Sequence, residues 1–94
     1  MRKPLVVIDV ADVADARHVH RRLAEALAFP AWYGCNGDAF WDAITGLVDM
    51  PEQLRLIGWH AFERRCNAEA RIIKQCLDRM SEEFPTLAAQ VEYA

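Results

Sequence analysis

The run Leu5–Val10 is short, rich in β-branched residues and almost continuously apolar. That pattern predicts a β-strand covered by helices. The next segment, over about 13–28, has apolar residues at helical spacing. Asp12 can cap this helix and Pro30 ends it. A covered strand that leads straight into a helix indicates an α/β fold.

The rest of the chain repeats this alternation. Asn36 can cap a second helix over about 37–45, with Gly46 as its stop. Three further segments are predicted downstream: a strand over 53–59, a helical region over 60–84 that Asn67 could divide, and a last strand over 87–93. With 94 residues, of which 53% are hydrophobic, the chain predicts one domain over 1–94. Its expected fold is a three-stranded parallel sheet with right-handed crossovers, packed by three to four helices.

Periodicity also predicts which side chains of the C-terminal half face the core. In the helical region the expected inward residues are Ile73, Cys76, Leu77, Met80 and Phe84. In the last strand one alternating face carries Leu87, Ala89, Val91 and Tyr93.

Several classes of protein are disfavoured by the composition. No apolar stretch approaches the roughly 20 residues of a membrane span. The three cysteines contain no Cys-x-x-Cys pair and predict neither a disulfide framework nor a zinc site, which suits a reducing cytoplasm. His18 and His20 point to different faces of the first helix, so no metal is predicted, nor any other cofactor. We expect His20 in the core and the other two histidines in solvent.

Residues 23–54, which we call the acidic window, contain no lysine or arginine. Its acidic residues are Glu25, Asp38, Asp42, Asp49 and Glu52. Its aromatic residues are Phe29, Trp32, Tyr33, Phe40 and Trp41. Neighbouring carboxylates repel one another unless a cationic partner neutralises them, and large rings supply contact area. The window therefore predicts a binding face for a basic protein, and it argues against nucleic acid or an anionic membrane.

Asp38 and Asp42 lie four positions apart on the second predicted helix and so share a face. The helix dipole can favour Asp38 in the first turn, but it does little for Asp42. A catalytic pair of carboxylates is disfavoured, because a chain of this length has little room for a substrate cleft. Of Trp32 and Tyr33, adjacent in a loop, one is expected to pack inward while the other stays available to a partner.

The residues from Phe29 to Gly46 read Phe-Pro-Ala-Trp-Tyr-Gly-Cys-Asn-Gly-Asp-Ala-Phe-Trp-Asp-Ala-Ile-Thr-Gly. This run resembles the signature of the barstar family, the intracellular inhibitors of the secreted bacterial ribonuclease barnase. The predicted order of elements agrees with that family over nearly the whole chain. The resemblance implies a non-enzymatic, cytoplasmic protein that is monomeric when free. It would plug the active site of a basic extracellular ribonuclease in a 1:1 complex.

The resemblance also implies roles for individual residues. Asp42 would be the chief anchor and stand in for a phosphate group, with Asp38 beside it. Trp32 takes the place of a tyrosine that stacks on a histidine of the nuclease, and Asn36 and Gly37 bring backbone groups close. The expected partner-binding residues are Trp32, Tyr33, Gly34, Asn36, Gly37, Asp38, Trp41, Asp42, Thr45, Gly46 and Asp49.

Two departures from the family pattern point to a partner somewhat different from barnase. Cys35 stands where the family has an acidic residue. The family also uses a carboxylate from its last helix, and either Asp78 or Glu82 could replace it here.

Two other functions stay open at this point. One is an interaction or immunity module of the same fold that binds a basic toxin other than a ribonuclease. The other is a homo-oligomer that buries Trp32 and Trp41, which opposed carboxylates disfavour.

Overall fold

Three parallel strands form one sheet in the computed structural model, which describes residues 2–94. They are β1 (Leu5–Asp9), β2 (Gln53–Ile57) and β3 (Gln90–Tyr93), in the spatial order β1-β2-β3. In this register Ile8 lies opposite Leu56, and Leu56 lies opposite Tyr93. The predicted parallel sheet of three strands is confirmed.

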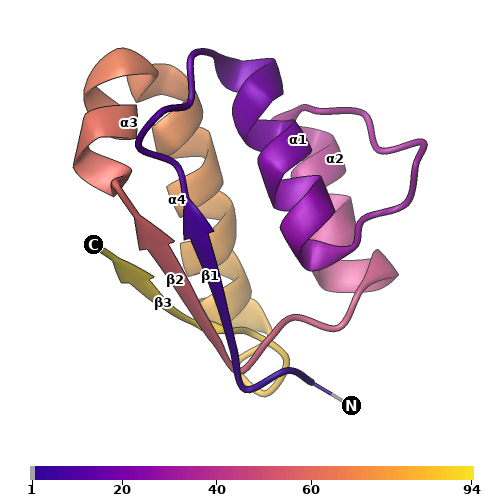
Figure 1. Ribbon diagram of the computed structural model, residues 1–94. Helices are drawn as coiled ribbons and strands as arrows, with labels where there is room; N and C mark the ends of the chain where they lie inside the picture. Colours follow the sequence, from indigo (N-terminus) through magenta and orange to yellow (C-terminus); the bar gives the residue numbers. More distant parts are fainter. Residues whose placement is uncertain (1) are drawn as a thin grey trace.

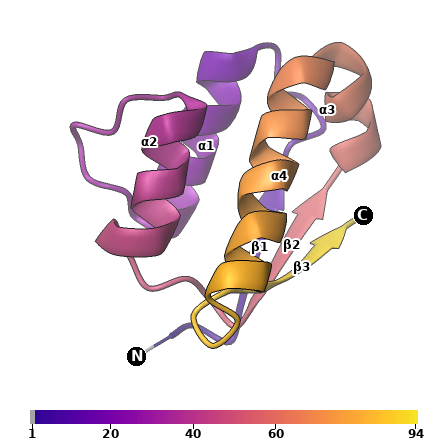
Figure 2. The same ribbon diagram turned by 180° about the vertical axis from the view of Figure 1, so that it is seen from behind.

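The helices all lie on one face of this sheet (Figures 1 and 2). They are α1 (Ala16–Leu27), α2 (Gly37–Asp42), the π-helical turn η1 (Ala43–Leu47), α3 (Trp59–Arg65) and α4 (Asn67–Glu83). The strand order explains the one-sided arrangement. Parallel crossovers share one hand, so two successive crossovers in the same direction place their helices on the same face.

The first strand is therefore covered on one face only. Ile8 is buried, whereas Leu5 and Val7 point away from the helices and are 41% and 47% exposed. The apolar run predicted a strand correctly, but helices do not cover both of its faces. The strand also ends at Asp9, one residue earlier than predicted.

The first helix begins later than predicted. Asp15, not Asp12, is its N-cap, and the Asp15 carboxylate accepts a hydrogen bond from the His18 backbone N–H at 2.8 Å. Asp12 instead pairs with Arg22, whose guanidinium donates to it and lowers the pKa of that carboxyl. His18 is half-buried beside Arg22, so its predicted position in solvent is wrong.

The second helix begins as predicted and ends differently. The Asn36 side chain caps it by accepting the Ala39 backbone N–H at 2.8 Å. Gly46 does not stop the helix, because the chain continues through it as η1 up to Leu47. The helical region predicted over 60–84 is indeed divided, at Cys66 just before Asn67. The second strand stops at Ile57, before Trp59 begins α3.

The core lies between the sheet and the helices. Its largest fully buried side chains include Phe40 of α2 and Phe62 of α3, with Leu23, Ile44 and Met50 around them. His20 is also fully buried, as predicted.

Two predicted core residues prove to be exposed. Phe84 lies just past the end of α4 at 40% exposure, and Leu87 lies in the turn before β3 at 52%. Helical periodicity predicts a buried Phe84 and strand alternation predicts a buried Leu87. Both predictions are wrong, because α4 ends before Phe84 and the chain turns before β3 begins.

The Arg2 side chain connects the N-terminal segment to the loops that precede β2 and β3. Its guanidinium donates to the backbone carbonyls of Met50, Pro51, Thr86 and Ala88, at 2.8–3.0 Å. The loops before β2 and β3 are thereby joined at the N-terminal edge of the sheet. Within residues 2–94, no helix has both the length and the apolar character needed to cross a membrane.

Candidate partner-binding face

The loop between α1 and α2 begins with two tight backbone turns. Ala28 ends α1 in the left-handed conformation at φ 60°, and its N–H donates to the Ala24 carbonyl. The Tyr33 N–H then donates to the Pro30 carbonyl at 3.0 Å. Cys35, also left-handed at φ 54°, leads into the Asn36 cap of α2. These turns carry the loop outward from the body of the molecule (Figure 1).

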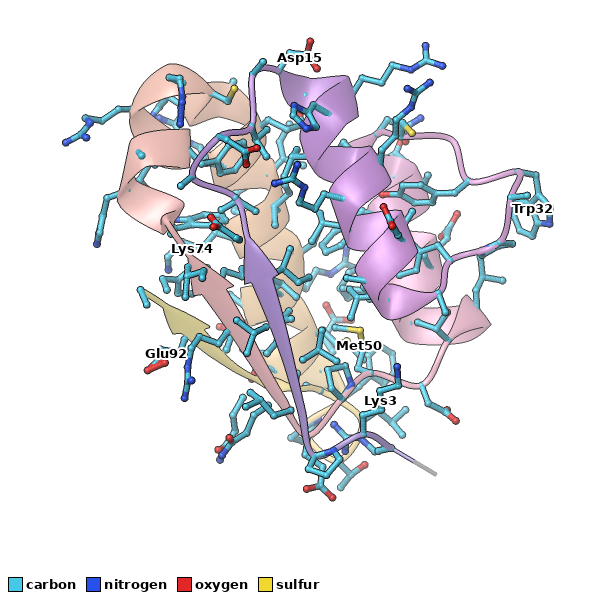
Figure 3. The ribbon with its side chains drawn as sticks, viewed as in Figure 1. Lys3, Asp15, Trp32, Met50, Lys74 and Glu92 are labelled. Carbon is cyan, nitrogen blue, oxygen red and sulfur yellow. The ribbon has the colours of Figure 1, made fainter. Side chains whose placement is uncertain are left out.

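The two adjacent loop aromatics point in different directions, as predicted. Trp32 is 72% exposed and stands at the outer tip of the loop (Figure 3). Tyr33 is half-buried, with its ring 4.8 Å from that of Phe29. Its hydroxyl lies 2.7 Å from His20 Nδ1. One aromatic thus anchors the loop while the other is free for a partner.

The five carboxylates of the acidic window stay unpaired throughout the described residues. Neither Asp38 nor Asp42 takes part in an ion pair or accepts a side-chain hydrogen bond within residues 2–94, and both are exposed. The same holds for Glu25, Asp49 and Glu52. Outside the window, Glu82 is the one acidic side chain of residues 2–94 without such a partner. The unpaired acidic residues are therefore concentrated where the sequence placed them.

A cation from another element nevertheless reaches this face. The guanidinium carbon of Arg79, on α4, lies 4.2 Å from the centre of the Trp41 ring, which is a cation–π contact. Arg79 also forms an ion pair with Glu83. The window is free of cations along the sequence, but the surface that it forms is not.

Arg79 and Asp38 line the same groove, which runs between α2 and α4. The groove is lined by Asn36, Gly37, Asp38, Trp41, Ile72, Gln75, Cys76 and Arg79. The α4 members of this group were missed by the sequence analysis. Their spacing places Ile72, Cys76 and Arg79 on one helical stripe, but nothing in the sequence says which element that stripe faces.

Neither candidate for the last-helix carboxylate lies in this groove. Asp78 pairs with Lys74 at 3.3 Å, and Lys74 Nζ stands 5.1 Å from the centre of the Tyr93 ring on β3. Asp78 is therefore on the side of α4 that faces the sheet edge. Glu82 is exposed and does not line the groove either. The α4 residue that the groove does present beside Trp41 is basic.

Three of the remaining predicted residues lie at the C-terminal end of this face, and Gly34 lies on the loop. Thr45, Gly46 and Asp49 line a separate hollow together with Arg2 and Leu87. The Thr45 hydroxyl donates to the Trp41 carbonyl at 2.6 Å, so its proton is already used inside the helix. Gly34 is exposed on the loop, and its carbonyl accepts from the Asn36 side chain at 3.2 Å.

Two free thiols lie in this region, those of Cys35 and Cys76. Burial raises the pKa of Cys76, so its thiolate is disfavoured, and its Sγ lies 3.9 Å from the Gly37 carbonyl. Cys35 is half-buried in its left-handed turn. Within residues 2–94, no three His, Cys, Asp or Glu side chains are grouped so that they could hold a metal ion. What the face offers a partner is charge and aromatic surface.

Comparison with known proteins identifies the fold family. The family model described as "Barstar (barnase inhibitor)" matches residues 3–93. The chain belongs to the barstar family. The chain is also similar to a protein of Bacillus subtilis (strain 168) named "Putative ribonuclease inhibitor YrdF". It is 33% identical over 88 residues, which cover 89% of this chain and 94% of the relative.

Membership of the barstar family confirms the resemblance drawn from residues 29–46 and extends it over the whole domain. The family description names an inhibitor rather than an enzyme. The roles expected of Asp42, Asp38 and Trp32 stay predictions.

Proposed function

We propose that this chain inhibits a basic ribonuclease by covering its active site with α2 and the loop before it. The carboxylates of Asp42 and Asp38 would meet the cations that the nuclease uses on RNA phosphates, and Trp32 would stack on its active-site surface. The complex would be 1:1. The inhibitor would act in the cytoplasm and protect its producer from an enzyme destined for secretion.

The observation that carries this proposal is the distribution of unpaired carboxylates. Within residues 2–94, eight of the nine acidic side chains outside the window accept a hydrogen bond or an ion pair, and none of the five inside it does so. Exposed carboxylates on one face repel each other, so leaving them unpaired has a small cost in the free protein. Cations of a basic partner would attract these carboxylates and so replace the repulsion between them.

The aromatic residues support the same face. Trp32 is the most exposed large hydrophobic side chain of the described chain, and Trp41 flanks Asp42 on α2. Trp, Tyr and Arg are the residues most enriched among binding hot spots. The family description and the name of the Bacillus relative agree with a ribonuclease as the partner.

The test is an inhibition assay of the purified chain against a panel of basic secreted ribonucleases that includes barnase. We expect Asp42→Ala to weaken the inhibition of a responding enzyme by at least about 2 kcal/mol, or roughly 30-fold, because it leaves desolvated cations of the nuclease unpaired. The barnase–barstar complex is itself one of the systems on which this typical loss of binding free energy at a hot-spot residue is based. Asp38→Ala should follow with a smaller loss.

Asp78→Ala is the matched control, because Asp78 is an exposed carboxylate outside this face. Its effect on inhibition should be negligible.

Denaturant melts of free Asp42→Ala should show a stability that is unchanged or up to about 1 kcal/mol higher, since repulsion with Asp38 is removed. An inhibitor unaffected by Asp42→Ala would contradict the role of this face. A wild-type chain that inhibits no ribonuclease yet captures a basic toxin from its native organism would favour the immunity module instead.

A further inference from the structure

A fully buried histidine connects the binding loop to α4. His20, on α1, is 0% exposed, and both of its ring nitrogens are engaged. Nδ1 lies 2.7 Å from the hydroxyl of Tyr33, and Nε2 is bonded to the carboxylate of Glu69, near the start of α4. The three residues, which we call the His20 network, join α1, the loop and α4 through one ring.

The donor and acceptor roles within the His20 network follow from its ends. An ionised carboxylate can only accept, so Nε2 carries a proton and donates it to Glu69. The Tyr33 hydroxyl can donate or accept, and it donates to Nδ1 when the ring carries its proton on Nε2 alone. Every polar atom of the ring is satisfied in this arrangement, as a fully buried imidazole requires.

Tyr33 is the one residue through which the loop is hydrogen-bonded to a distant part of the described chain. The other hydrogen bonds of residues 30–36 join groups no more than four positions apart. The Tyr33 ring also packs on Phe29 at 4.8 Å and on His20 at 5.8 Å. Its neighbour Trp32 has no such support and is 72% exposed. The orientation of Trp32 therefore depends on how firmly Tyr33 is held.

We propose that His20 and Glu69 are positioning residues for partner binding. They fix the Tyr33 hydroxyl, and thereby hold the loop in the conformation that presents Trp32 and leads into the Asn36 cap of α2. A loop that is already ordered loses less conformational entropy when it binds. This inference rests on the proposed function for its binding consequence, but its effect on the loop can be measured in the free protein.

The first experiment measures loop order by NMR in the free chain. Tyr33→Phe removes only the hydroxyl and keeps the ring on Phe29. We expect the backbone order parameters of residues 31–36 to fall from about 0.85 toward 0.6 or below, with the helices unchanged. Tyr93→Phe is the matched control, because the Tyr93 hydroxyl is buried without a hydrogen-bond partner in residues 2–94 and lies on β3, away from the loop. It should leave the loop unchanged.

Variants of Glu69 separate positioning from a direct contact with the partner. Glu69→Ala should loosen the loop as Tyr33→Phe does, although its site is on α4. Glu69→Gln should restore most of the loop order, because its amide oxygen still accepts the Nε2 proton. In the wild type, the ¹⁵N shifts of the His20 ring should show the proton on Nε2. An unchanged loop in Tyr33→Phe, or a Gln variant as disordered as the Ala variant, would overturn the proposal.

The second experiment measures dissociation constants with barnase, or with whichever ribonuclease the inhibition panel identifies. Tyr33→Phe and Glu69→Ala should each weaken binding by about 5-fold or more, as expected from one buried hydrogen bond, with Glu69→Gln close to the wild type. A loosened loop with unchanged affinity would overturn the binding role of the network. A wild-type chain that binds no ribonuclease would contradict the proposed function, while the order parameters would still decide whether the network positions the loop.

Discussion

Single polar residues of this chain fall into two groups according to whether the fold uses them. Asp15 caps a helix, Asp12 holds Arg22, and Glu69 holds His20. Asp38 and Asp42 do none of this within residues 2–94, although Asp38 lines the same groove as Arg79. Because neither carboxylate has an internal partner in the described residues, we expect both to be replaceable with little effect on stability, as for a functional rather than a structural carboxylate.

Tyr93 yields a prediction about alkaline pH. Burial raises the pKa of Tyr93, and likewise that of Tyr33, above the usual value of 10.0. A raised folded pKa means that stability is retained below pH 10 and lost above it, where the unfolded chain ionises first. Tyr93→Phe should therefore flatten the loss of stability between about pH 10 and pH 11.5.

Denaturant melts of wild type and Tyr93→Phe at pH 7 and pH 11 provide the measurement. At pH 7 the variant should be as stable as the wild type or more stable by up to about 1 kcal/mol, since the hydroxyl has no partner in residues 2–94. Parallel loss of stability in both proteins from pH 7 to pH 11 would show that Tyr93 does not contribute to alkaline unfolding.

Among the elements, α2 depends most on its neighbours. It spans only Gly37–Asp42, so it is too short to be stable alone, and packing must hold it. Phe40 is its buried residue, and α4 packs against it. At the closest approach, a Cβ added to Gly37 would lie 2.6 Å from Cγ2 of Ile72. The position of the acidic face is thus set by the contact between α2 and α4.

Gly37→Ala tests this contact. The added methyl group must displace Ile72, and we expect a loss of about 1 kcal/mol in the free energy of unfolding, together with weaker partner binding as α2 shifts. Gly46→Ala is the matched control, since a Cβ at Gly46 meets nothing within 4 Å. It should leave stability unchanged or slightly raised.

The double variant Gly37→Ala/Ile72→Ala should recover most of the loss, because Cγ2 is then absent. Chemical denaturation of the four proteins in this cycle gives the coupling between the two sites. Strictly additive losses would mean that the close approach at Gly37 does not control the packing of α2.

At the scale of the whole molecule, charge is distributed unevenly. The net charge is −3, yet the acidic window alone holds five acidic residues and no lysine or arginine. Arg79 modifies this picture locally, because it lies over Trp41 and beside the groove that Asp38 lines. Under the proposed function, a nuclease would meet a mainly acidic face on which Arg79, paired with Glu83, adds a basic group beside the groove.

Association with a basic nuclease should accordingly be fast and sensitive to salt. Exposed charges are screened beyond about 10 Å at 0.1 M ionic strength, so raising the salt should slow association far more than it changes dissociation. Stopped-flow measurements at two ionic strengths give both rates. Asp38→Asn should reduce the salt dependence of association, whereas an association rate that does not change with salt would point to recognition by shape and apolar contact alone.

Patterns within a short stretch of chain were enough to predict much of this protein. The sequence alone predicted the parallel α/β fold, the Asn36 cap, the division before Asn67 and the opposite orientations of Trp32 and Tyr33. These depend on side-chain periodicity and on capping chemistry, which act between residues a few positions apart. The family signature from Phe29 to Gly46 is equally local.

Contacts between distant segments were decided only by the tertiary structure. Periodicity states which residues share a helical face, but not which element that face meets. The sequence therefore could not show that Arg79 lies over Trp41, or that Glu69 holds His20 against Tyr33. Nor could it show that Leu5 and Val7 stay exposed, because that follows from the strand order β1-β2-β3 and the shared hand of its crossovers.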